Sequence, residues 1–154
     1  MLPIAGLAFK ISLVPFHFWT VDVYEGALIG VASYLSVISK GAAAFILMIL
    51  LFTVLKPLIH VWENIVYVIA LATMFIGNLF ALRQQNMKRF LAFSSIAQAG
   101  FILLGLISGT QLGTATVVYF VLVYIFTNLA AFGVVQAISL KTGKENMDDY
   151  NGLY

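Results

Sequence analysis

Two lysines lie within segments of the sequence that are otherwise almost entirely apolar. Lys10 follows LPIAGLAF, and Lys40 interrupts the run SYLSVIS and GAAAFILMILLF. A lysine amine can bind and release a proton, and a charge near the middle of a membrane-spanning helix costs about 2.5–3.5 kcal/mol on insertion scales. Such residues generally face a protein interior or a water path, so both lysines are candidates for a proton relay.

Lys40 is the deeper of the two. Its apolar segment runs from Leu28 to Leu55, which at about 1.5 Å per residue places Lys40 about 18 Å and about 23 Å from the two ends. Ser36 and Ser33 precede it by one and two helical turns on the same face and could bind water. In the alternative reading Lys40 pairs with a carboxylate for structure alone, but no acidic residue lies deep inside any apolar segment of the chain.

Pro15 follows Lys10 by five residues and predicts a break in the first helix over residues 13–16, because proline removes a backbone hydrogen bond and clashes with the preceding turn. The carbonyl groups that the proline frees could solvate the Lys10 ammonium. Alternatively, Lys10 only extends toward a membrane interface. His17 would share the face of Lys10 in a continuous helix and extend a proton path, and a hydrogen-bonded interfacial histidine is an equal alternative.

Neutral polar side chains recur in the later segments. They are Thr73, Asn78, Ser94, Ser95, Gln98, Tyr124, Thr127 and Asn128. Ser94 and Gln98 are one helical turn apart and are candidates for holding water between ionisable groups. Hydrogen bonding between helices is the commoner role of such residues in membranes. Asp22 and Glu25 fall in a predicted loop over residues 20–27, where we interpret them as solvated loop acids.

The elements that must position these residues are membrane-spanning helices. The sequence is 62% hydrophobic and 9% charged, whereas soluble domains have about 25% charged residues. A span needs about 20 apolar residues. The five segments that qualify are Leu2–Trp19, which Pro15 breaks, Leu28–Leu55, Val61–Leu82, Phe90–Ile107 and Thr114–Leu140. We predict an all-α membrane protein with a transmembrane helical segment over residues 1–140, belonging to a larger domain, and a polar cytoplasmic loop or tail over residues 141–154.

The basic residues of the connections predict the orientation. One side of the membrane would collect Arg83, Lys88, Arg89, Lys141 and Lys144, and the other side only Lys56. The positive-inside rule places the first set in the cytoplasm. The apolar start has no positively charged region typical of a cleavable signal peptide. An odd number of spans and the loop-like ending DDYNGLY lead us to expect a partial chain.

Composition also narrows the chemistry. The sequence has no cysteine, which excludes disulfides and cysteine-ligated zinc or iron–sulfur clusters, and its two histidines, His17 and His60, are far apart, so we expect no metal site. A net charge of +2 without a basic run gives no indication of nucleic-acid binding.

Three stretches closely resemble the antiporter-like subunits of respiratory complex I. They are GLAFKISLVPFHFWTVDVYEGA, the SYLSVISKGAAAF segment that carries the second lysine, and NMKRFLAFSSIAQAGF. Within that family, DVYEGA is most similar to the subunit N branch, the counterpart of mitochondrial subunit two. The resemblance implies a fold of about fourteen helices with two inverted five-helix repeats, of which this chain would supply helices seven to eleven. It also implies that Lys10 is the broken-helix lysine, with its acidic partner on an upstream helix, and that Lys40 is the central-channel lysine.

The function that the resemblance implies is proton translocation, by a membrane subunit of NADH-quinone oxidoreductase, coupled to quinone reduction elsewhere in the enzyme. The implied partners are the other complex I membrane subunits, the lipid bilayer and protons. NADH, FMN, iron–sulfur clusters and quinone would bind to other subunits, with no cofactor in this chain. The implied location is a bacterial inner membrane, or alternatively an organellar inner membrane.

Two alternatives to this function stay open. One is a sodium/proton antiporter or membrane-bound hydrogenase subunit of the same fold, which DVYEGA disfavours. The other is a non-catalytic truncated fragment. Val21 and Leu28 stand where the family usually has proline, which leaves open the rigidity of the connection and the start of the next helix.

Overall fold

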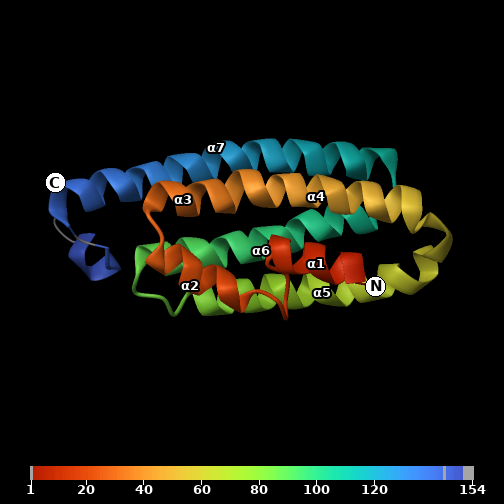
Figure 1. Ribbon diagram of the computed structural model, residues 1–154, viewed down its shortest axis with the longest axis horizontal. Coiled ribbons are helices and arrows are strands. Elements are labelled where there is room, and N and C mark those ends of the chain that lie inside the picture. Colours follow the sequence, from red (N-terminus) through yellow and green to blue (C-terminus); the bar gives the residue numbers. More distant parts are fainter. Residues whose placement is uncertain (1, 144, 151–154) are drawn as a thin grey trace.

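A computed structural model describes residues 2–143 and 145–150 of the chain. The described residues form an elongated bundle of helices joined by short turns (Figure 1). The α-helices are α1 (Leu2–Ile11), α2 (Phe18–Gly26), α3 (Ile29–Tyr34), α4 (Lys40–Ile49), α5 (Ile59–Ala81), α6 (Met87–Ile107) and α7 (Gln111–Thr142). Two π-helical segments, Leu35–Ser39 and Leu50–Val54, follow α3 and α4, and two short 3₁₀ helices occur at Lys56–Leu58 and Met147–Tyr150.

Four helices of the described residues are long and apolar enough to cross a membrane. Their ranges are Ile29–Val54, Lys56–Ala81, Met87–Ile107 and Gln111–Thr142. The first of them combines α3, α4 and the two π-helical segments into one continuous rod. These ranges agree to within a few residues with the last four predicted spans. The all-helical, multi-pass architecture expected from the sequence is confirmed.

The first predicted span consists of two helices, α1 and α2, which follow one another along the bundle (Figure 1). Residues 12–17 between them are not part of either helix, so the break expected at Pro15 is confirmed and is one residue wider at each end than predicted. Lys10 lies in the last turn of α1, just before the break.

The loop predicted over residues 20–27 is wrong, because α2 continues to Gly26. Thr20, Val21 and Tyr24 form a buried face at helical spacing, while Asp22 and Glu25 lie on the exposed face of the same helix. Two carboxylates in a short stretch indicated a loop, but they are compatible with an amphipathic helix. Leu28 is extended and α3 begins directly after it, so the helix starts there without a proline at position 28.

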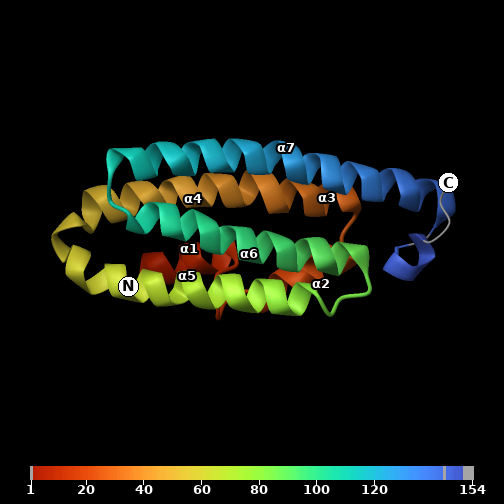
Figure 2. The same ribbon diagram turned by 180° about the vertical axis from the view of Figure 1, so that it is seen from behind.

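α5 and α6 lie side by side along the bundle with very close backbones (Figure 2). A Cβ added at Gly77 of α5 would lie 2.7 Å from the backbone nitrogen of Ala97 on α6. A Cβ at Gly100 of α6 would lie 2.6 Å from Cγ of Met74 and 3.0 Å from the carbonyl oxygen of Ala70. Small residues at helix interfaces permit the dispersion contacts that stabilise helix pairs in membranes.

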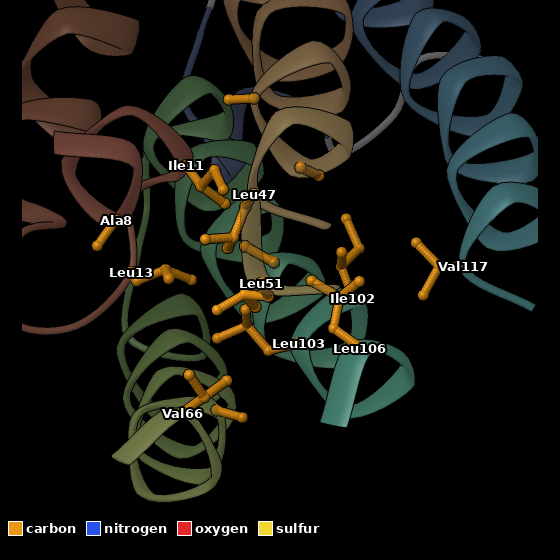
Figure 3. Packing of buried hydrophobic residues seen from close by; sticks show 14 of the residues in the cluster. Ala8, Ile11, Leu13, Leu47, Leu51, Val66, Ile102, Leu103, Leu106 and Val117 are labelled. Carbon is orange, nitrogen blue, oxygen red and sulfur yellow. The ribbon is translucent and has the colours of Figure 1, made fainter. Parts of the chain in front are cut away.

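Two apolar clusters fill the interior. The larger one joins Ile11 of α1, Leu47 of α4, Leu103 of α6 and Val117 of α7 (Figure 3). The smaller one contains Tyr24 of α2 and Phe132 of α7, together with residues near the start of α6. The polar groups described next therefore lie in surroundings that are otherwise apolar.

The connections gather at the two ends of the bundle as the alternation of spans predicts. The turn before α6 contacts the segment after α7, where Met87 N donates to Glu145 O (2.9 Å) and Lys88 Nζ lies 3.0 Å from Glu145 Oε2. At the opposite end, Lys56 and Gln111 line one cavity. The assignment of the end that holds Lys88 and Glu145 to the cytoplasm stays a prediction. The predicted boundary between the membrane segment and the polar tail, at residue 140, also stays a prediction, and α7 continues two residues beyond it.

Candidate functional site

Lys40 lies at the junction between the π-helical segment Leu35–Ser39 and α4, near the middle of the continuous helix. Only 4% of its surface is exposed. A π-helical segment contains a wider turn than an α-helix and is frequent at functional sites. The lysine that the sequence indicated as deepest is thus buried in protein, next to a local irregularity of its own helix.

The ammonium group of Lys40 has neutral neighbours. Nζ donates a hydrogen bond of 2.8 Å to Ser95 Oγ on α6, and Ser95 Oγ in turn donates to the Ala92 carbonyl oxygen at 2.7 Å. Nζ also lies 5.6 Å from the centroid of the Tyr24 ring on α2, a distance at which the ring face attracts a cation. Within the described residues no carboxylate lies within 4.0 Å of Nζ. These neutral dipoles stabilise the ammonium. A negatively charged counter-ion would stabilise it more strongly and would oppose the release of its proton.

A small cavity of about 10 Å³ adjoins Lys40. Ile11, Ser95 and Tyr124 are among the residues that line it, and the surface that they present to the cavity is apolar. This volume is at the lower limit for one water molecule, about 10–15 Å³. The cavity is therefore a small apolar gap beside the lysine, with no polar surface to bind an ordered water.

Tyr124 links this cavity to two further groups. Its hydroxyl lies 3.1 Å from Ser36 Oγ, and it donates to the Ser36 carbonyl oxygen at 3.3 Å. Tyr124 also lines an open groove of about 270 Å³ between α6 and α7. Ser94 and Gln98, the two candidates for holding water, line this groove too. The tyrosine thus stands between the groove and the cavity beside Lys40.

Ser36 and Ser33 were expected on the face of Lys40. Both are buried, but Ser36 contacts Tyr124, and neither serine lines the cavity beside Lys40. The π-helical segment explains the difference, because its wider turn shifts the register between Ser36 and Lys40 away from α-helical stacking. Ser36 contacts Tyr124, which lines the cavity beside Lys40.

Lys10 and His17 do not share a face. Lys10 is exposed at the end of α1, whereas His17 is buried and its ring packs on Phe18 with centroids 4.2 Å apart. His17 Nδ1 has no hydrogen-bond partner among the described residues. The break between them turns the chain, so the alignment of a continuous helix is lost.

The break itself is pinned by hydrogen bonds. Val14 N donates to Thr73 Oγ1 on α5 at 3.1 Å, and Trp19 Nε1 donates to the Phe9 carbonyl oxygen at 2.9 Å. The Trp19 ring also stacks on Phe9, with centroids 5.2 Å apart. Pro15 therefore interrupts the helix at a place where other groups satisfy the backbone, as membrane depth requires.

Three residues of the Lys40 site were not assigned to it from the sequence: Ser95, Tyr124 and Tyr24. The first two stood out only as polar residues in apolar helices, and Tyr24 was hidden in the predicted loop. All three have a hydroxyl group within a mostly apolar stretch of sequence. This feature alone does not predict which face of each helix contacts the lysine. No group of three or more potential metal ligands occurs within residues 2–143 and 145–150.

Comparison with known proteins gives one consistent family. All of residues 1–154 match the family model described as NADH:quinone oxidoreductase/Mrp antiporter, TM. NADH-quinone oxidoreductase subunit N of Phocaeicola vulgatus is 57% identical over 151 residues, which are 97% of this chain and 32% of that protein. NAD(P)H-quinone oxidoreductase subunit 2 of a Picosynechococcus species is 50% identical over 151 residues, 98% of this chain and 29% of that protein. The chain spans about a third of the length of these curated relatives.

Solved structures show the same fold. A chain of the membrane-bound sulfane sulfur reductase, an archaeal respiratory membrane complex, superposes with a TM-score of 0.86 at 27% identity, covering 96% of this chain and 31% of that one. A chain of respiratory complex I from Thermus thermophilus superposes with a TM-score of 0.69 at 33% identity, covering 86% of this chain and 28% of that one.

Proposed function

The chain belongs to the NADH:quinone oxidoreductase/Mrp antiporter transmembrane family, and on this basis we propose that it is the proton-translocating part of a membrane subunit of NADH-quinone oxidoreductase. The relatives of 57% and 50% identity are named as subunits of quinone oxidoreductases, which supports this choice within the family. Proton movement would be coupled to quinone reduction in other subunits.

The observation that carries the proposal is the environment of Lys40. Its amine is buried, it donates to Ser95, and within the described residues no carboxylate lies within 4.0 Å of it. In the proposed step, the Lys40 ammonium gives a proton to a water that enters the site beside Ser95, and the neutral amine later accepts another proton from the opposite direction. A fixed counter-ion would oppose this release, and the neutral hydroxyl groups do not.

A path for the proton follows from the polar residues around the site. Ser94 and Gln98 line the groove between α6 and α7, and Tyr124 lies between the groove and the Lys40 cavity. On the other side, Ile11 of the cavity lining is adjacent in sequence to Lys10. We propose that Lys10 is the next proton-exchanging group, with the buried His17 as a further member, and that Ser33 and Ser36 support the path through Tyr124.

The assembly follows from the same proposal. Because the chain spans about a third of the length of its curated relatives, its activity requires the rest of its own subunit. It also requires the other membrane subunits of the complex and the bilayer. NADH, FMN, iron–sulfur clusters and quinone would bind elsewhere in the complex. The proposed location is a bacterial inner membrane, with the end that holds Arg89 and Glu145 in the cytoplasm.

A sodium/proton antiporter subunit is the second candidate. The family model, which covers Mrp antiporters as well as NADH:quinone oxidoreductases, supports it, but the relatives of 57% and 50% identity favour the quinone oxidoreductases. Pumping that persists at full rate in sodium-free medium would support the first candidate, and a strict sodium requirement would support the second.

The experiment is Lys40→Arg in the complete subunit within the assembled complex. Arginine keeps a positive charge but does not release its proton near neutral pH, so NADH-driven proton pumping should be lost while assembly persists. Lys56→Arg, at the end of the bundle, is the matched control and should pump normally. Normal pumping by an assembled Lys40→Arg variant would overturn the proposal.

A further inference from the structure

A cluster of charged residues at one end of the bundle ties α2 to α6. Arg89, in the first turn of α6, binds Glu25 of α2 through Nη1, and the same nitrogen lies 3.7 Å from Asp22 Oδ1. Arg89 Nε donates to Gln84 Oε1 at 3.2 Å, which orients the guanidinium group from the turn before α6. We name Arg89, Asp22, Glu25 and Gln84 the arginine clamp.

The two helices that the clamp joins are the two that support the Lys40 ammonium. Tyr24 lies between Asp22 and Glu25 in α2, and its fully buried ring (0% exposed) lies 5.6 Å from Lys40 Nζ. Ser95, the hydrogen-bond acceptor of Lys40, lies six residues after Arg89 in α6, about 9 Å farther along the helix axis. A change in the spacing of α2 and α6 would therefore change the distance from Nζ to at least one of these two groups.

The far side of Tyr24 is also fixed. Its ring meets Phe132 of α7 edge-on, with centroids 6.3 Å apart. α2 has only nine residues and is joined to α1 by the open break over residues 12–17. The buried face of α2 and the contact of Trp19 with Phe9 also hold this helix. The ion pair on its exposed face adds a direct connection to α6 on either side of Tyr24.

From these contacts we propose that the arginine clamp is a positioning device: it holds α2 against α6 so that the Tyr24 ring and Ser95 together support the Lys40 ammonium. The Tyr24 ring faces the cation, and Arg89, Asp22 and Glu25 act through it. This inference rests on the proposed proton exchange at Lys40. According to this inference, the efficiency of proton exchange at Lys40 also depends on the three charged residues of the clamp and on the Tyr24 ring.

The test uses the complete subunit in its assembled complex, with NADH-driven proton pumping measured per electron and assembly measured in parallel. Tyr24→Leu should lower pumping about thirtyfold, the rate equivalent of losing a desolvated cation–π contact. Arg89→Gln keeps the ring but loosens its position, and should lower pumping by a smaller factor. Tyr24→Phe keeps the ring and should retain pumping. Arg83→Gln, an exposed arginine in the turn before α6, is the matched control and should have no effect.

A charge swap separates positioning from a general loss of structure. The double variant Glu25→Arg with Arg89→Glu restores the pair with reversed signs and should recover most of the pumping that either single change removes. Absence of recovery, or normal pumping by Arg89→Gln, would overturn the inference. Lys40→Ala distinguishes the two proposals. If the Lys40→Ala variant pumps normally, proton exchange at Lys40 is rejected. If Lys40→Ala does not pump but Tyr24→Leu pumps normally, only the role of the arginine clamp is rejected.

Discussion

The two lysines have opposite surroundings. Lys40 is buried, and its neighbours come from three other helices of the chain: Tyr24 of α2, Ser95 of α6 and Tyr124 of α7. Lys10 is exposed at the end of α1, and among the described residues it has no carboxylate within 4.0 Å. Within the described residues, Lys40 is thus enclosed by other helices, whereas Lys10 is not.

The backbone irregularities near the lysines also differ. The π-helical segment before Lys40 keeps the helix continuous, whereas the segment after Lys10 leaves both helices. Two carbonyl groups in the last turns of α1 accept hydrogen bonds from the break: Ala8 O from Leu13 N, and Phe9 O from Ser12 N and Trp19 Nε1. The comparison teaches that the chain uses part of its freed backbone to stabilise the break, whereas solvation of Lys10 by the remaining carbonyls stays a prediction.

Of three single changes that leave Lys40 itself in place, the largest effect should come from removing its hydrogen-bond acceptor. Ser95→Ala leaves the buried ammonium without this contact, and hydrogen bonds to charged groups contribute about 1.5–3 kcal/mol, which is about tenfold or more in a rate. We expect a loss of proton pumping of that size with normal assembly. The matched control is Ser94→Ala, the preceding residue, which lines the outer groove and should have a smaller effect. If the two serine variants lost the same fraction of proton pumping, the hydrogen bond from Lys40 to Ser95 would have no specific role in pumping.

A second change should weaken both regions together. Gly77 of α5 lies one turn after Thr73, which holds the break, and packs against Ala97 of α6, two residues after Ser95. Gly77→Ala would force the two backbones apart, and overpacking costs about 1–3 kcal/mol, so thermal unfolding of the purified complex should begin at lower temperature. Gly133→Ala in α7, where an added Cβ meets nothing within 4 Å, should leave the unfolding temperature unchanged or raise it slightly. A Gly77→Ala protein as stable as this control would contradict the close packing of α5 and α6.

The smallest effect should be confined to the break. Trp19→Phe removes the donor to the Phe9 carbonyl oxygen but keeps an aromatic ring against Phe9, which should cost about 1 kcal/mol. Hydrogen exchange at the amides of Ser12 and Leu13 should become faster. Trp62→Phe removes a similar bond, from Trp62 Nε1 to Leu55 O, and should leave these two amides unchanged. Unchanged exchange in the Trp19→Phe protein would show that the tryptophan does not stabilise the break.

The sequence predicted the features that depend on composition and on single residues. Apolar length placed the spans, Pro15 located the break, and the depth of Lys40 in its segment singled it out. The contacts between helices could not be predicted, because they depend on the rotation of each helix about its axis. Ser95 rather than Ser94 meets Lys40, and the π-helical segment moves Ser36 toward Tyr124. Asp22 and Glu25 resembled loop acids because their partner, Arg89, is distant in sequence.

The most direct test of the account is the number of protons pumped per electron by the assembled complex carrying Lys40→Ala. The change removes the proton-exchanging amine and also removes a buried charge, so insertion and assembly should be normal. We predict that quinone-linked proton pumping is lost or strongly reduced in membranes that contain the wild-type amount of complex. A Lys40→Ala complex with the wild-type ratio of protons to electrons would contradict proton exchange at Lys40 and leave this buried lysine a structural role only.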